Sequence, residues 1–489
     1  TLTDNAGNES APSPARTITI DTTSPTVSSV VISATGASGS LLNAGDVVTV
    51  TATYSETVTG QPTAAPTLTI GTETGITLTP GTTTGNTRTW TYTITDTGTT
   101  DTGSISVVGN LVAGLSDAAG NAATGSTPAA SGVFTADTTA PTVSISDNAT
   151  GTANGDVIFT YTFAEAVTGF DASKVTVTGG TKGLFTVVST TVYTLVVTPA
   201  ASSTADIVLT TSTVGVTDAA GNVATAPATY SQAVDTVAPT AIDLITGNGS
   251  VDATESQFYN VSNAAAGKTL FANIQASSDT DIAIIKVAVG GAVADTSNDK
   301  LLIVGTSTDT INLNTIPQNG TETISGIAVS WSYSSGKVLT ISQTGGGVFT
   351  ALQVQTIEQA LQFKTATGAT QGDRSFTISH TDLSGNTGTS AVETVAVDTI
   401  APDAPTSAPS GYKDDVGTSQ SITSTAANTD DTTPGILVGA NLTTTTPKLY
   451  ANGSLVAATY DAVAGTLTPN AALAEGSYSF TYTLTDSAG

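Results

Sequence analysis

Residues Val47–Tyr54 read Val-Val-Thr-Val-Thr-Ala-Thr-Tyr, and this alternation decides the fold class. Apolar or aromatic side chains alternate with small polar ones, the pattern of a strand with one buried face. The same pattern occurs at Val157–Phe163, Thr89–Ile94 and Tyr478–Leu484, with Gly, Asn and Asp between such stretches. The sequence therefore predicts an all-β protein built from antiparallel β-sandwiches.

Two short sequences recur along the chain and divide it into modules. The first, Asp-x-x-Gly-Asn, occurs at Asp4–Asn8, Asp117–Asn121, Asp218–Asn222 and Asp382–Asn386, and Asp486–Gly489 begins another copy. The second, Asp-Thr-x-x-Pro, follows each complete copy, at Asp21–Pro25, Asp137–Pro141, Asp235–Pro239 and Asp398–Pro402. We call the first the turn sequence and the second the linker sequence.

The linker sequences predict five segments in tandem. Residues 1–20 are expected to be the tail of a preceding module, residues 21–137, 138–235 and 236–398 three complete modules, and residues 399–489 a module cut at its C-terminal end. The chain contains no Met, and both of its ends fall at the same point of the repeat, so we expect a window from a longer array. In the longest module, partial helical spacing predicts a helix at Ala351–Phe363.

Composition excludes several classes of function. The 489 residues include 12 Lys and Arg against 39 Asp and Glu, a net charge of -27, which repels phosphate backbones and anionic lipids. We therefore expect no nucleic-acid partner. The absence of Cys excludes disulfides and thiolate metal sites. The longest apolar stretch, Ile282–Ala294, contains Lys286 and is too short to cross a bilayer, so no membrane insertion is expected.

An enzyme is not expected, because the residues for an active site are scarce. His380 is the only histidine, and its alternation with Phe376 and Ile378 predicts a strand residue near the core edge rather than a catalytic base. The two tryptophans, Trp90 and Trp331, lie in different modules, which argues against the cleft of a glycosidase.

The acidic residues around the repeated sequences are the candidate metal ligands. No Lys or Arg lies between Thr89 and Lys174, so carboxylates that converge there would lack a cationic partner. Calcium prefers carboxylate and carbonyl oxygens. The alternative is that each turn Asp only accepts backbone N–H bonds in a tight turn, and both roles stay open. The candidate calcium ligands are Asp21, Asp117, Asp137, Asp218, Asp235, Asp382, Asp398, Glu56 and Glu165.

Several stretches resemble the bacterial Ig-like repeats of giant cell-surface adhesins, the class of biofilm-associated and type I secreted repetitive adhesins. Val47–Gly60 and Val157–Gly169, each with an acidic residue after the aromatic one, are similar to one Ig-like subtype. In the last module, Asp414–Gly417, Thr429–Pro434, Tyr450–Gly453 and Leu473–Gly476 are similar to the biofilm-associated type. In the long module, Ala360–Phe363 and Gly372–Phe376 resemble cadherin-like repeats.

This resemblance implies tandem Ig-like and cadherin-like sandwiches in an extended rod. It also implies a non-enzymatic, extracellular stalk on a bacterial cell surface, with calcium at module junctions and a role in cell adhesion and biofilm formation. The expected partners are neighbouring modules of the same chain, with any cell-surface or matrix ligand bound by regions outside this window.

Two other functions stay open at this point. One is a structural subunit of a surface layer or extracellular filament, in which a terminal strand such as Ala15–Ile20 is exchanged head to tail between chains. The other is a carbohydrate- or surface-binding module within residues 236–398. Residues Lys268–Arg374 carry half of the basic side chains, and Trp331, Tyr333 and Phe349 are candidates for an aromatic platform there.

Overall fold

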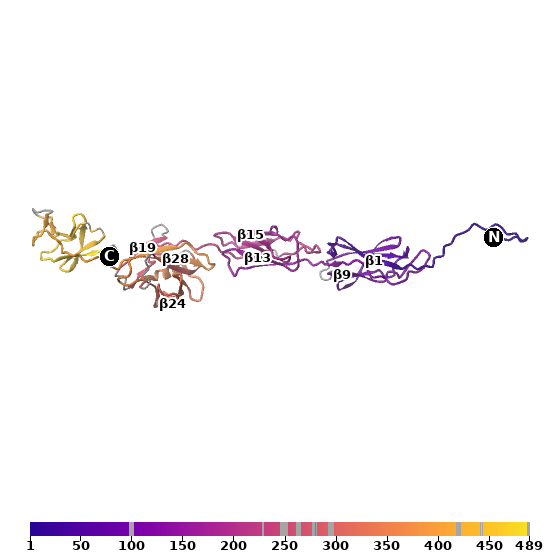
Figure 1. The fold of residues 1–489 in the computed structure, drawn as a ribbon, viewed down its shortest axis with the longest axis horizontal. Helices are drawn as coiled ribbons and strands as arrows, with labels where there is room; N and C mark the ends of the chain where they lie inside the picture. The colour runs from indigo at the N-terminus through magenta and orange to yellow at the C-terminus, as the bar shows by residue number, and fades with distance from the viewer. Residues whose placement is uncertain are drawn as a thin grey trace. The chain divides into compact units, whose positions relative to one another are not determined.

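The computed structural model describes residues 1–96, 102–226, 229–244, 253–260, 266–275, 279, 281–291, 298–416, 422–440, 442 and 444–486. The chain forms two compact units, residues Thr1–Asp235 and Thr236–Gly489. Almost every regular element is a strand, and the pairing is mainly antiparallel, which confirms the predicted all-β class of tandem β-sandwiches (Figure 1). No helix among the described residues is long and apolar enough to cross a membrane.

The first unit contains two sandwiches, and the first of these lies within residues 21–137. One sheet has the order β1-β3-β8-β7 and the other β2-β11-β9-β5-β6, with β4 and β10 paired separately. The strands are β1 (Val27–Thr35), β2 (Leu41–Leu42), β3 (Val47–Tyr54), β4 (Thr59–Gly60), β5 (Thr67–Ile70), β6 (Glu73–Thr77), β7 (Thr79–Thr84), β8 (Thr87–Thr93), β9 (Gly103–Val108), β10 (Leu115–Ser116) and β11 (Thr135–Ala136). The alternation predicted for Val47–Tyr54 is exact, since every second side chain of β3 is buried.

The second sandwich lies within residues 138–235 and repeats this plan with fewer strands. Its sheets have the orders β12-β13-β16-β15 and β14-β17-β18. The strands are β12 (Val143–Asp147), β13 (Val157–Phe163), β14 (Val175–Thr178), β15 (Gly180–Val187), β16 (Val192–Pro199), β17 (Ile207–Thr211) and β18 (Tyr230–Gln232). Alternate residues of β13 are buried, among them Phe159, Tyr161 and Phe163, and these form the centre of its core.

The second unit begins with the largest sandwich, within residues 236–398. Its sheets have the orders β19-β29-β28-β21-β26-β25-β24 and β20-β27-β22-β23. The strands are β19 (Thr254–Tyr259), β20 (Lys268–Thr269), β21 (Ile282–Gly290), β22 (Lys300–Val304), β23 (Thr308–Asn312), β24 (Gln318–Ile324), β25 (Ile327–Tyr333), β26 (Val338–Gln343), β27 (Leu361–Lys364), β28 (Gly372–Asp382) and β29 (Ala391–Val397).

The helix predicted at Ala351–Phe363 is shorter than expected. Helix α2 spans Ala351–Gln359, and Thr350 caps it through a capping box with Gln353. Leu361 and Phe363 belong instead to β27, where both are fully buried. Leu361 and Phe363 also fit the helical spacing of the residues before them, so the pattern predicted too long a helix. Pairing of β27 with β22 holds both residues in a strand instead.

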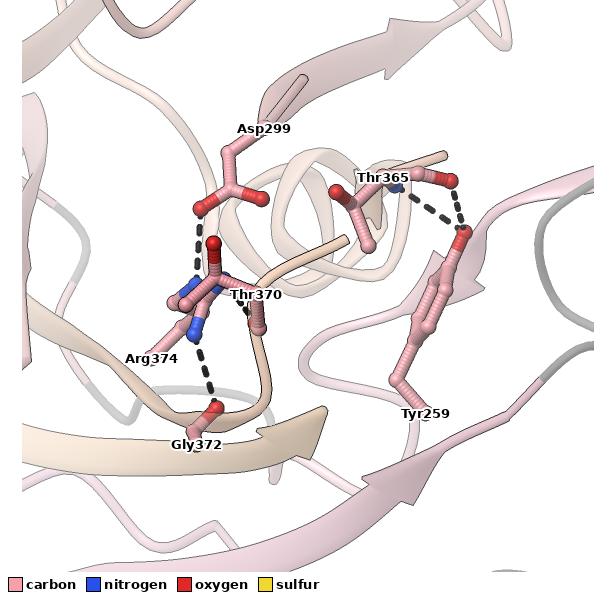
Figure 2. Close-up of polar contacts among 6 residues, drawn as sticks. All are labelled: Tyr259, Asp299, Thr365, Thr370, Gly372 and Arg374. Atoms are coloured by element: carbon pink, nitrogen blue, oxygen red, sulfur yellow. Dashed lines mark hydrogen bonds and ion pairs between the residues drawn. The ribbon is translucent and has the colours of Figure 1, made fainter. Parts of the chain in front are cut away.

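A buried ion pair ties together distant parts of this third sandwich (Figure 2). Arg374 Nε donates to Asp299 Oδ2 at 2.7 Å, and both side chains are almost completely buried. The two terminal nitrogens of Arg374 donate to the carbonyls of Gly372 and Thr370, each at 2.8 Å. Nearby, the Tyr259 hydroxyl donates to the Thr365 carbonyl. This network orders the segment that leads into β28.

The fourth sandwich lies within residues 399–486 and has the smallest core. Its sheets have the orders β31-β30-β32-β36-β35 and β34-β33-β37. The strands are β30 (Tyr412–Asp414), β31 (Ile422–Ser424), β32 (Gly435–Leu437), β33 (Thr446–Ala451), β34 (Ser454–Val456), β35 (Ala458–Asp461), β36 (Thr466–Pro469) and β37 (Phe480–Thr485). The strand predicted at Tyr478–Leu484 corresponds to β37.

Candidate metal sites

The turn sequences adopt one conformation wherever the structure describes them. In the second module, Asp218 Oδ1 accepts the backbone N–H groups of Gly221 and Asn222, at 2.7 and 2.9 Å, and Oδ2 accepts the Asn222 side-chain amide at 2.8 Å. Gly221 has φ +99°, a conformation that glycine adopts without strain. Asp4, Asp117 and Asp382 bind their Asn partners in the same way. The turn-capping role of these aspartates is therefore present in the structure.

The Asn of the turn sequence connects the turn to the linker sequence. Its side-chain amide also donates to the carbonyl of the linker Asp, from Asn121 to Asp21 at 3.0 Å and from Asn222 to Asp137 at 2.7 Å. Nothing in the repeated sequences indicates this second bond, which joins residues 85 to 100 positions apart. The Asn thus holds the linker Asp beside the turn Asp of the module that follows this linker.

Asn222→Ala is expected to lower the free energy of unfolding of the first unit by about 1–3 kcal/mol, because two hydrogen-bonded groups lose their shared partner. Differential scanning calorimetry of the full chain measures the loss. Asn8→Ala is the matched control, since Asn8 sits in the same kind of turn within exposed residues. A loss as small as the Asn8 control shows would contradict the connecting role of Asn222.

Two groups of three carboxylates lie in the first unit, and both consist of predicted ligands. Asp21, Glu56 and Asp117 form one, and their ligand oxygens all lie within 4.8 Å of one another. Asp137, Glu165 and Asp218 form the other, at the same separation. We call these the first and second acidic clusters. Each combines the linker Asp, the Glu that follows the aromatic strand, and the turn Asp.

The local structure explains how the three carboxylates meet. The glutamates follow β3 and β13, each two residues after the last aromatic side chain of its strand. The linker aspartates Asp21 and Asp137 each accept a backbone N–H from the residue two positions ahead, which turns the linker toward the module. Asp117 and Asp218 are the buried members of their clusters.

The electrostatics of both clusters favour a cation. Partial burial raises the pKa of Glu56, and the charges of Asp21 and Asp117 raise it further. Glu165 follows the same pattern, with its pKa raised by burial and then by Asp137 and Asp218. Hydrogen bonds from the Asn121 side chain instead lower the pKa of Asp117. Among the described residues, no Lys, Arg or His side chain forms an ion pair with these carboxylates.

The donor set fits calcium better than a softer or smaller ion. Calcium binds oxygen at about 2.3–2.6 Å, so ligands on opposite sides of the ion are about 5 Å apart. The oxygens of each cluster already lie within 4.8 Å of one another, and all are carboxylates. Six to eight oxygen ligands complete a calcium site, and waters or nearby carbonyls such as that of Asp21 are the available additional donors.

The other predicted ligands, Asp235, Asp382 and Asp398, are not members of the first or second acidic cluster. Asp382 ends β28 and is buried in its turn, and in the second unit the carboxylate of Asp281 lies within 4.8 Å of it. Asp281 was missed from the sequence, although its place directly before the apolar strand Ile282–Gly290 was visible. Asp235 and Asp398 end their modules, and their backbone N–H groups donate to Ala153 and Tyr259 at 2.9 Å.

The basic and aromatic residues of the third sandwich do not form an exposed platform. Tyr333 and Phe349 are fully buried, and Trp331 is 7 % exposed with its Nε1 bonded to Asp309 at 2.6 Å. His380 is also buried, 2.5 Å from Glu358 of α2. These side chains belong to the core, as the strand alternation predicted for His380, and they do not form the aromatic platform.

Comparisons with known proteins give one family match, which covers part of the chain. Residues 137–238 match the family model of the bacterial Ig-like domain. Among solved structures, the chain is similar to an ICAM-5 D1–D4 ectodomain fragment, with 10 % identity over 94 % of this chain and 98 % of that one and a TM-score of 0.23. No curated protein matches. The family match supports the Ig-like repeats that the sequence predicted, and it coincides with the module that holds the second acidic cluster.

Proposed function

We propose that this chain is a non-enzymatic stalk segment of a bacterial surface adhesin, in which calcium stiffens the connections between successive modules. The observation that carries the proposal is the repeated acidic cluster, in which a linker Asp meets the Glu and turn Asp of the following module. A cation there would bind the linker and the module at once. Extracellular calcium, at millimolar concentration, suits weak sites of this kind.

The role of each residue in the cluster follows from its contacts. The turn aspartates Asp117 and Asp218 are oriented by their Asn partners, so their carboxylates are pre-positioned. Glu56 and Glu165 are the members whose charged forms are disfavoured, and a bound cation would relieve that cost. Calcium would supply charge neutralisation and would restrict the direction in which the linker enters the next module.

The linker itself adds stiffness without a metal. Each linker sequence ends in Pro, which fixes φ and removes one backbone donor. In the third module, the linker residue Pro239 lies so close to Gly388 that a Cβ on Gly388 would approach the Pro239 carbonyl oxygen to 2.7 Å. Close packing of the linker against the module that follows supports a spacer whose length and direction are set by repeated contacts.

Small-angle X-ray scattering of the full chain in excess calcium and then in excess chelator tests this function. We expect a larger maximum dimension and a narrower range of shapes with calcium. The double variant Glu56→Gln/Glu165→Gln is the control, and its scattering should respond less. A maximum dimension that is the same with calcium and chelator, and the same in both proteins, would contradict calcium-dependent stiffening.

A single substitution separates repulsion from calcium binding. Without calcium, Glu165→Gln should raise the melting temperature of the second module, because the amide removes a charge next to Asp137 and Asp218. With calcium at about 100 times its Kd, the wild-type chain should gain about 2.7 kcal/mol from one site. The variant should gain less, so the order of stabilities reverses on addition of calcium.

Calorimetric melting with and without calcium measures this reversal. Glu9→Gln is the matched control, because Glu9 lies in exposed residues outside both clusters. If Glu165→Gln lowered the melting temperature without calcium and left the calcium response intact, the cluster would be neither strained by repulsion nor a calcium site.

The alternative of a carbohydrate-binding module within residues 236–398 lacks the platform on which it was based, since Trp331, Tyr333 and Phe349 are all in the core.

A further inference from the structure

The first and last described strands of the third sandwich pair with each other. β19 runs parallel to β29, and all six residues of β19 have a partner on β29, beginning with Thr254 opposite Val392. β29 directly precedes the linker sequence that begins at Asp398. One continuous ladder therefore joins an early strand of this module to the strand from which the chain leaves it.

The backbone bonds of this ladder follow a regular alternation. Ala253 accepts a bond from the Val392 N–H at 2.7 Å, and Tyr259 accepts one from the Asp398 N–H at 2.9 Å. The bonds of a parallel ladder are evenly spaced, at every second residue. The odd-numbered residues of β19 therefore turn their backbone groups toward β29. β19 is the outer strand of its sheet, so the even-numbered residues turn theirs toward the open edge.

Side chains fasten β19 to the rest of the sandwich. Gln257 Nε2 donates to the carbonyls of Thr269 and Leu270, at 3.1 and 3.0 Å, and so ties β19 to the start of the facing sheet. The Tyr259 hydroxyl donates to the Thr365 carbonyl and accepts the Thr365 N–H, both at 3.0 Å (Figure 2). β19 cannot slide along β29 without breaking these bonds as well.

The first and second sandwiches have no comparable ladder among their described residues. In the first, parallel pairing between an early strand and the last strand joins β2 to β11, each of which has only two residues. In the second, the parallel pairs are isolated bridges, such as the one between Ala153 and Val234. The third sandwich therefore joins its early and last strands through the longest parallel ladder of the three.

The direction of a pull along the chain gives this difference a mechanical meaning. Such a pull acts on β19 from its N-terminal end and on β29 from its C-terminal end. Because the two strands are parallel, these are opposite ends of the ladder, and the pull shears all of its bonds together. Bonds that share a load break at a higher force than bonds that are opened one after another.

We propose that the third sandwich is the most resistant to tension of the first three modules, with the ladder of β19 and β29 as its mechanical clamp. The first and second sandwiches unfold at lower force and lengthen the chain while the third keeps its fold. Unfolding under force is governed by the barrier to unfolding rather than by equilibrium stability. The proposal holds whether or not the acidic clusters bind calcium.

Pulling the full chain by its two ends in excess chelator ranks the modules without any contribution from calcium. The third module spans the most residues, so its unfolding releases the longest stretch of chain and identifies it. We expect this longest step to come after those of the first and second modules, at a higher force. A longest step that precedes either of them would overturn the proposal.

Two pairs of attachment points test the clamp itself, since the chain has no cysteine of its own. Handles on Thr254→Cys and Ile400→Cys pull β19 and β29 from opposite ends of the ladder. Handles on Thr254→Cys and Thr389→Cys pull both strands from the same end of the same module. All three positions are exposed. We expect the first pair to require several times the force of the second, and equal forces would overturn the proposal.

Proline substitutions separate the bonded side of β19 from its open edge. Gln257→Pro removes an N–H that faces β29, whereas Ser256→Pro removes one that faces the open edge. Gln257→Ala measures the share of the side chain. We expect Gln257→Pro to unfold at least about tenfold faster than Gln257→Ala at constant force, and Ser256→Pro to stay close to the wild type. Equally fast unfolding of the two proline variants would contradict the clamp.

Discussion

Replacing Asp299 with Ala is expected to lower the free energy of unfolding of the third sandwich by about 3–5 kcal/mol. The Arg374 guanidinium would keep its bonds to Gly372 and Thr370 but lose its only carboxylate partner among the described residues, at a place that is 1 % exposed. A buried cation without its counter-charge is among the costliest single defects in a core. The change removes no apolar packing, which separates this effect from a cavity.

Denaturant unfolding followed by Trp331 fluorescence measures this loss, in a Trp90→Phe background so that only the third sandwich reports. The double variant Asp299→Leu/Arg374→Met supplies the control, because removal of both charges leaves no unpaired ion. We expect it to be more stable than either single variant. A loss below about 1 kcal/mol for Asp299→Ala would place this pair with weak surface ion pairs and contradict its structural role.

The second large effect concerns Glu393, a fully buried carboxyl on β29 that pairs across the sheet with Glu255 of β19. Burial, and then the charge of Glu255, raise the pKa of Glu393 to about 8 from an ordinary value of 4.5. The folded chain therefore holds a proton that the unfolded chain releases between these two pH values. Stability from this group is present below pH 4.5 and is lost as the pH rises toward 8.

Glu393→Gln should remove this pH dependence. Above pH 8 the variant should be more stable than the wild type, by at most about 3–5 kcal/mol from the difference in pKa. Near pH 4 the two proteins should be similarly stable. Urea unfolding of the full chain across this pH range, read by Trp331, is the measurement.

Glu322 provides a control of opposite sign in the same module. Its carboxylate accepts bonds from the Ser307 hydroxyl and the backbone of Ser307 and Thr323, and these bonds lower its pKa. Glu322→Gln should therefore destabilise the fold at neutral pH, and the difference should shrink as the pH falls through the pKa of the folded state. Parallel pH profiles for the wild type and Glu393→Gln would contradict the assignment of a neutral Glu393.

Local pattern was sufficient to predict much of the fold. The strict alternation of Val47–Tyr54 and Val157–Phe163 predicted β3 and β13 with their buried faces. The turn sequence predicted a closed turn because Asp, Gly and Asn each have a local reason to be there. These features depend on residues within a few positions of one another, so a single sequence contains their cause.

Long-range pairing is what the sequence could not supply. Leu361 and Phe363 were placed in a helix because their partner strand, β22, is about 60 residues away in the chain. Asp299 and Arg374 meet across a similar separation, and Glu255 and Glu393 are brought together only by the parallel pairing of β19 with β29. Asp281 was missed for the same reason, since nothing near it in sequence points to Asp382.

The acidic clusters could be predicted from the sequence only in part. Repetition identified the aspartates, and the position after an aromatic strand identified Glu56 and Glu165. The sequence could not decide between turn capping and metal binding, and the geometry now shows why both are compatible. The side-chain amides of Asn121 and Asn222 each donate to Oδ2 of their turn Asp. The linker Asp and the Glu each place a carboxylate oxygen within 4.8 Å of an oxygen of the same turn Asp.

Isothermal titration of the chelator-treated full chain with calcium determines whether the acidic clusters bind calcium, and Glu56→Gln/Glu165→Gln is measured beside it. We expect saturable calcium binding in the wild type, and a double variant that binds fewer ions or binds them at least about tenfold more weakly. Identical titration curves for the two proteins, or no binding by the wild type at millimolar calcium, would mean that these carboxylates are turn caps and linker contacts alone.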